Sequence, residues 1–185
     1  MVDVSGHLGM TLLWLAPSWL VFEHSKPAAM FVASGLPFGM GPDLDLVFSR
    51  IFRTIRHHGI FHTVLAVTVL AAIVGPVVGK LLERVAGGSD WFPVTNTRDS
   101  YRFGFLAVWV AGCSHVFADI LSAPDIAQAV EPFWPLSLKP VGVDLVWYNA
   151  AWFNWGLLVA GILVNAGLFA YNGGIDQMAV VSNSD

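Results

Sequence analysis

Long runs of apolar residues alternate with short polar turns along the whole chain. Five runs can be distinguished, with approximate bounds 6–22, 27–40, 60–82, 103–121 and 145–171. A membrane-spanning helix needs about 20 predominantly apolar residues, so the second run, with 14, is short. The pattern predicts an all-α integral membrane protein with about five transmembrane helices, the second short or re-entrant. Pro17 predicts a kink in the first of them.

The segment between the second and third runs, GPDLDLVFSRIFRTIRHHGIFHT, is the most ionisable part of the chain. Arg50, Arg53 and Arg56 recur at every third position among apolar residues, which predicts a short amphipathic helix at the membrane interface. The arginines can also be read as a topogenic signal that keeps this side in the cytoplasm.

Composition supports a membrane location. Hydrophobic residues make up 56% of the chain and charged residues only 12%, compared with roughly 25% in soluble domains. The net charge of -4 gives no basic field, so we expect no nucleic-acid partner. We expect a single transmembrane domain over 1–185, multi-pass in the inner or plasma membrane and in contact with lipid, with a polar, frayed tail at 172–185.

Residues of the metal-ligating types gather in three separate places. They are His7; Asp43, Asp45, His57, His58 and His62; and His115 with Asp119. Five crossings would put the start of the first run, the segment before the third and the end of the fourth on one side of the membrane. A charged residue deep in a membrane is costly, so we expect Asp119 near the end of its helix or paired. The proline-rich stretch after it should fold back over this face as a lid or rim.

Each group also has a purely structural interpretation. Asp43 and Asp45 could cap a helix N-terminus, and His115 with Asp119 could be a hydrogen-bonded pair that joins helices. His57 and His58 could simply extend the interfacial arginine run, and we give His58 less weight than His57. The joint occurrence of all three groups favours a site over these interpretations.

The order and spacing of these residues resemble the membrane-bound metal-dependent hydrolase family, which includes LexA-binding, inner-membrane-associated hydrolases. Four elements and a terminal histidine carry the resemblance across nearly the whole chain: His7, Pro42-Asp43-Leu44-Asp45, His57-His58-Gly59-Ile60-Phe61-His62-Thr63, His115-Val116-Phe117-Ala118-Asp119 and Trp134-Pro135. Two positions depart from the family pattern, since His58 stands where the family has Arg and Thr63 where it has Ser.

The hypothesis is therefore an integral-membrane hydrolase that uses one or two divalent ions, zinc by preference, to activate water. The expected substrate is a small molecule or lipid, as a phosphoester or lipid-like ester at the membrane face, tentatively the cytoplasmic face. The expected metal ligands are His7, Asp45, His62, His115 and Asp119, and the expected catalytic residues are Asp43 and His57. The alternative is a membrane protein that binds metal or protons without catalysis, in a regulatory, partner-binding or transport role.

Overall fold

The computed structural model describes residues 2–122, 128–143 and 145–173. The predicted tail lies outside this part of the chain from residue 174 onward. The described residues form nine helical elements: α1 (Val4–Leu15), α2 (Ser18–Val21), α3 (Ser25–Gly35), η1 (Leu36–Met40), α4 (Leu44–Ile51), η2 (Ile60–His62), α5 (Val64–Ala86), α6 (Thr97–Leu121) and α7 (Ala151–Tyr171).

The first pass of the bundle is a broken helix. α1 ends at Leu15 and α2 begins at Ser18, so the break falls at Ala16 and Pro17 and the predicted kink is confirmed. Asp3 caps α1 by accepting a hydrogen bond from the Gly6 amide at 3.0 Å. At 1.5 Å per residue the two pieces together span about 27 Å, close to the roughly 30 Å of a hydrocarbon core.

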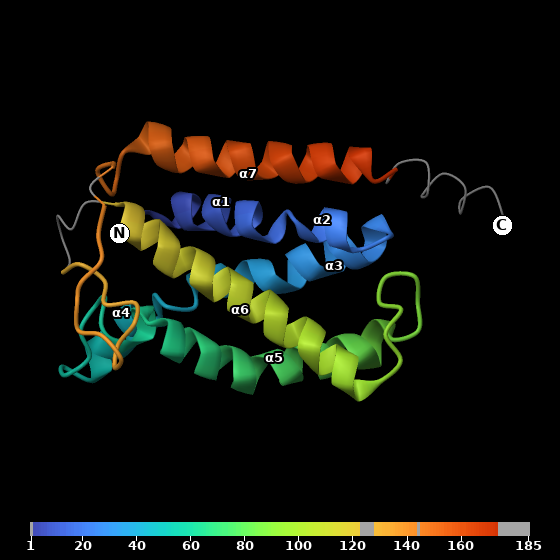
Figure 1. Ribbon diagram of the computed structural model, residues 1–185, viewed down its shortest axis with the longest axis horizontal. Coiled ribbons are helices and arrows are strands. Elements are labelled where there is room, and N and C mark those ends of the chain that lie inside the picture. The colour runs from blue at the N-terminus through green and yellow to red at the C-terminus, as the bar shows by residue number, and fades with distance from the viewer. Residues whose placement is uncertain (1, 123–127, 144, 174–185) are drawn as a thin grey trace.

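The second pass returns along the first and is also made of two pieces. α3 continues directly into the 3₁₀ helix η1, which contains Pro37. The tighter helix rises about 2.0 Å per residue, which lets a short segment cover most of the distance. In Figure 1 this pass runs from the α2 end of the bundle to the α4 end, so the segment crosses and does not turn back.

The remaining passes are the three helices α5, α6 and α7, each long and apolar enough to cross a membrane. They lie side by side with the broken passes in Figure 1, and the chain alternates in direction from one pass to the next. The described residues contain no β-strand, only isolated bridges. The prediction of an all-α membrane protein is confirmed.

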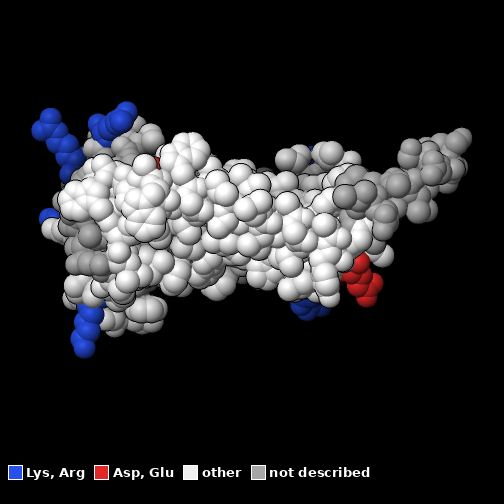
Figure 2. All heavy atoms as spheres, turned by 90° about the horizontal axis from the view of Figure 1, so that it is seen from above, with Lys and Arg blue, Asp and Glu red and all other residues white. Residues whose placement is uncertain are grey.

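Charged side chains lie at the two ends of the bundle. Figure 2 shows Lys and Arg at the end where α4 lies, further charged groups towards the opposite end, and a broad uncharged band between them. The outward face of α5 is correspondingly apolar and exposed, at Leu65, Val69, Ile73 and Val77. This band is the surface that a bilayer would cover.

The predicted interfacial helix is shorter than its arginine pattern suggested. α4 ends at Ile51, and Phe52 adopts an extended conformation, so Arg53 and Arg56 lie beyond the helix. The extension of the helix through all three arginines was therefore wrong. The physical reason is the return path, because the chain must leave the helix early to bring the following histidines back into the bundle.

Small residues let α5 and α6 pack closely. A Cβ atom on Gly79 would collide with the backbone of Ser100, and one on Gly104 with the carbonyl oxygen of Gly75. Such close approach is typical of helices that associate in membranes, where dispersion contacts replace the hydrophobic effect. The packing fixes α6, and with it the histidine and aspartate near its end.

Candidate metal centre

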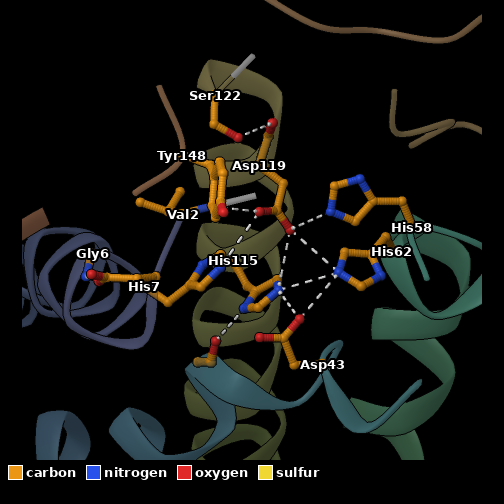
Figure 3. A network of polar contacts seen from close by, with 12 residues as sticks. Val2, Gly6, His7, Asp43, His58, His62, His115, Asp119, Ser122 and Tyr148 are labelled. Carbon is orange, nitrogen blue, oxygen red and sulfur yellow. Dashed lines mark hydrogen bonds and ion pairs between the residues drawn. The ribbon is translucent and has the colours of Figure 1, made fainter. Parts of the chain in front are cut away.

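Three distant parts of the chain meet at one end of the bundle. His7 comes from the first turns of α1, and the segment from Asp43 to His62 joins η1 to α5. His115 and Asp119 lie one helical turn apart near the end of α6, which ends at Leu121. Figure 3 shows side chains from all three parts pointing toward one another. The predicted convergence on one face, and the predicted position of the aspartate near its helix end, are confirmed.

Four side-chain atoms surround a common point. His62 Nε2 lies 3.3 Å from His115 Nε2 and 3.3 Å from Asp119 Oδ2, and the latter two atoms are 3.2 Å apart. Asp43 Oδ1 lies 3.6 Å from His62 Nε2 and 3.4 Å from His115 Nε2. Ligands about 2.0–2.1 Å from a tetrahedral ion are separated by about 3.3–3.4 Å. Five of the six edges of such a tetrahedron are therefore present.

The orientation of both inner histidines is fixed from behind. His115 Nδ1 donates to the Gly39 carbonyl oxygen over 2.7 Å, and His62 Nδ1 lies 3.1 Å from Asp45 Oδ2. A nitrogen that donates to a carbonyl or carboxylate carries its proton, so the neutral ring presents a lone pair at Nε2. Two imidazole lone pairs and two carboxylate oxygens then face one another, an arrangement that requires protons or a metal ion between them.

Asp45 supports two histidines at once. Its Oδ1 lies 2.9 Å from His57 Nδ1, and its Oδ2 faces His62. Burial would raise the pKa of the Asp45 carboxyl, but the hydrogen bonds from His57 and His62 outweigh it and lower the pKa to about 2. Asp45 is therefore a carboxylate at neutral pH. The alternative in which the aspartates cap a helix is not supported, because Asp43, at the N-cap of α4, makes no side-chain capping hydrogen bond.

His7 lies on the other side of the inner cluster. Its ring stacks on His115 with a centroid separation of 3.7 Å and an interplanar angle of 7°. His7 Nε2 is 3.4 Å from Asp119 Oδ1, which also accepts from the Val2 amide at 3.3 Å. Asp119 thus turns one carboxylate oxygen toward His7 and the other toward the four-atom cluster, the geometry of a carboxylate that could serve two positions.

His58 is the residue to which the sequence gave too little weight. It is buried, has a positive φ of 58°, and its Nδ1 donates to the Gln128 carbonyl oxygen over 2.7 Å. Its Nε2 points toward Asp119 Oδ2 at 3.8 Å. Burial lowers the pKa of His58 to about 4, so its ring is neutral at physiological pH. Its place within the histidine-rich element that resembles a family motif was the signal that could have identified it.

The segment after α6 covers this end of the bundle. Val130 and Val141 form an antiparallel bridge, and the Val64 amide at the start of α5 donates to the Pro132 carbonyl at 2.9 Å. Within the described part of the segment, the predicted fold-back over the face is confirmed; residues 123–127 and 144 lie outside it. Gln128 is the point at which this cover reaches the histidines.

A polar hollow of about 210 Å³ opens beside the cluster. The residues that line it include Arg56, His57, His58, Thr63, Gln128, Glu131 and Trp134. A smaller recess behind it is lined by His58 and Asp119 together with residues of the covering segment. The polar hollow is thus separated from the inner cluster by little more than the two histidine rings.

All seven predicted site residues lie in this one constellation. Within it, four overlapping groups of three residues could each hold a metal ion by the proximity of their ligand atoms: His57, His58 and His62; His7, His115 and Asp119; Asp43, His62 and His115; and Asp43, Asp45 and His57. The division into ligands and catalytic residues stays a prediction. The capacity of buried histidine and aspartate groups to hold an ion follows from the geometry.

Fold and site together define a multi-pass helical membrane protein with a buried His and Asp cluster at one face. The chain belongs to the YdjM inner membrane protein family, whose model matches residues 1–182. This membership agrees with the membrane location and with the membrane part of the resemblance seen in the sequence. No curated protein and no solved structure matches the chain.

Proposed function

We propose that the protein is an integral-membrane, metal-dependent hydrolase of a phosphoester or lipid-like ester. The observation that carries the proposal is the near-tetrahedral set of Asp43 Oδ1, His62 Nε2, His115 Nε2 and Asp119 Oδ2, with separations of 3.2–3.6 Å. Two imidazole nitrogens and two carboxylate oxygens in this geometry suit zinc. When bound, a divalent ion supplies an electrophile that lowers the pKa of a coordinated water towards neutrality.

The residues of the chain divide into two roles in this proposal. Asp43 joins His62, His115 and Asp119 as a ligand, because its Oδ1 faces both Nε2 atoms. Asp45 orients His62 from the Nδ1 side. Supporting carboxylates of this kind fix the tautomer and strengthen the ligand. His7 and the second oxygen of Asp119 are available to a further ion or to orient the first.

His57 is the proposed proton-transfer residue. It lines the polar hollow, and Asp45 Oδ1 holds its Nδ1 at 2.9 Å. A histidine held by a carboxylate can accept a proton from water on one side of a reaction and return it to a leaving group on the other. Its place between the hollow and the cluster is where such a transfer would be needed.

The experiment combines metal content with turnover. Protein purified in detergent is tested for bound metal and for hydrolysis of phospholipids and soluble phosphoesters, as wild type, His115→Ala and Asp119→Ala. His24→Ala is the matched control, since His24 is exposed in a turn between α2 and α3. We expect metal and turnover in wild type and control and loss of both in the two site variants. Equal turnover in all four proteins, or wild type without metal, refutes the proposal.

A second candidate is favoured by burial. His7, Asp45, His62 and His115 are each 0% exposed, which also suits an ion that holds α1, α6 and the intervening segment together without catalysis. In this case metal would be bound by wild type and lost in both site variants, its removal would lower the unfolding temperature, and no ester would be turned over.

A further inference from the structure

An apolar groove of about 360 Å³ lies beside the candidate centre, on the outer surface of α5. Its lining includes Pro42 and Phe61, which directly precede Asp43 and His62 in the chain, and then follows α5 through Leu65, Val69 and Ile73. The groove therefore begins at the candidate ligands and leads away from them along a membrane-spanning helix.

The groove faces the side of α5 that a bilayer would cover. Leu65, Val69 and Ile73 are 47%, 50% and 66% exposed and recur at every fourth position, so they form one apolar stripe. Eight residues of α helix rise about 12 Å, which is most of one leaflet of a hydrocarbon core roughly 30 Å thick. A groove of this length matches a substantial part of one acyl chain that enters from the site end.

The apolar groove adjoins the polar hollow. Ile60 lines both, so the two hollows meet at this residue. Arg56 and Glu131 both line the polar side, and exposed Arg50 and Arg53 follow α4 at the same end, where Figure 2 shows the basic side chains. The excess of arginines over this one acid favours an anionic headgroup next to the hollow.

We infer that the paired hollows bind one anionic membrane lipid, with an acyl chain along α5 and the headgroup at the polar hollow beside His57. The inference rests on the proposed function only for the reaction that follows binding; the groove itself is a lipid site independent of turnover. It defines the substrate class as a long-chain amphiphile with a phosphate-bearing head, presented from within the leaflet and not from water.

Photo-crosslinking tests the inference without any need for activity. Wild-type protein is reconstituted into phosphatidylcholine vesicles that contain a small fraction of phosphatidylglycerol with a diazirine in one acyl chain. Mass spectrometry then maps the crosslinks along α5. We expect them to concentrate at Leu65, Val69 and Ile73. Val77 and Leu81 serve as internal controls, because they are 66% and 60% exposed but do not line the groove. An even distribution over all five positions overturns the inference.

Two matched variants test the shape of the groove. Ala66 lines it, whereas Ala72 lies exposed on the same helix outside it. Ala66→Phe should lower crosslinking at the groove roughly tenfold, as expected when a pocket is filled, and Ala72→Phe should leave it unchanged. Equal crosslinking in both variants contradicts the proposal. Metal content, measured on the same samples, shows whether the substituted proteins keep the folded centre.

The headgroup preference is tested with two lipids. The same diazirine chain is placed on phosphatidylglycerol and on phosphatidylcholine, and Arg56→Gln is compared with wild type. We expect stronger labelling by the anionic lipid and a loss of this preference in Arg56→Gln. Equal labelling by both lipids in wild type overturns the anionic assignment. Turnover of a short-chain soluble phosphoester, measured in parallel, reports separately on the proposed hydrolase function.

Discussion

Asp43 and Asp45 stand one residue apart, yet the geometry gives them different relations to the candidate metal. Asp43 Oδ1 lies 3.4 Å from His115 Nε2 and 3.6 Å from His62 Nε2, on the inner side of both rings. Asp45 approaches His62 at Nδ1, from the outer side, at 3.1 Å. If this division is correct, substitution of the two aspartates must weaken metal binding to different degrees.

The size of the difference follows from the contacts. Asp45→Asn removes a supporting carboxylate, and loss of such a partner typically weakens metal binding by about 10–100-fold, or about 1.4–2.7 kcal/mol. The amide also offers N–H groups to two nitrogens that already donate, which favours the wrong tautomer of His62. Asp43→Ala removes one of four ligands outright, so we expect a loss greater than that of Asp45→Asn.

The assay is competition for zinc between a chromophoric chelator and detergent-purified protein. Asp90→Asn is the matched control, because Asp90 is exposed and pairs with Lys26 at 3.3 Å in another part of the chain. We expect wild-type affinity in the control, an intermediate loss in Asp45→Asn and the largest loss in Asp43→Ala. Wild-type affinity in Asp43→Ala, or a larger loss in Asp45→Asn, would refute the division of roles.

Four further outcomes follow from the structure. Gly79→Ala should lower stability by about 1–3 kcal/mol because its methyl group meets the backbone of α6, whereas Gly156→Ala, with no described atom within 4 Å of its Cβ, should not; thermal unfolding in detergent measures both. Asn165→Leu should cost about 1–3 kcal/mol, since Trp19 Nε1 loses its acceptor at 2.8 Å, and a melting temperature equal to wild type would contradict this. Metal affinity should fall as the pH is lowered through the neutral range: burial would lower the pKa of His62, but the neighbouring carboxylates raise it well above its usual value, so protons compete with the ion for Nε2. Titration calorimetry in buffers of different ionisation enthalpy should show proton release, and its absence at neutral pH would count against a protonated metal-free site. A reporter fused to the C-terminus should appear outside the cell if the candidate centre faces the cytoplasm; a cytoplasmic signal would reverse the orientation.

Hydrophobic patterning was sufficient to predict most of the fold. The five apolar runs correspond to the five passes, and the position of Pro17 located the break in the first. The convergence of distant ionisable residues also followed from counting crossings, because membrane topology restricts where each end of a helix can lie. These are properties that depend on one segment at a time or on the order of segments.

Properties that depend on contact between segments were less accessible. The arginine period suggested a longer helix than α4, because periodicity carries no information about where the chain must turn back. The burial of His58 depends on its bond to Gln128, seventy positions along the chain. Likewise, nothing in the sequence distinguishes the inner position of Asp43 from the outer position of Asp45, since this depends on which nitrogen of each histidine faces the aspartate.

The helix that closes the bundle contributes none of the candidate ligands. α7 packs chiefly on α1, and the Asn154 side chain accepts a hydrogen bond from the Asp3 amide at 3.3 Å. Every proposed ligand, however, lies at or before Asp119. During synthesis from the N-terminus, the ligand set is therefore complete before α7 leaves the ribosome. The outer face of α1 is covered only when α7 arrives, so His7 takes its final place later than the rest of the cluster.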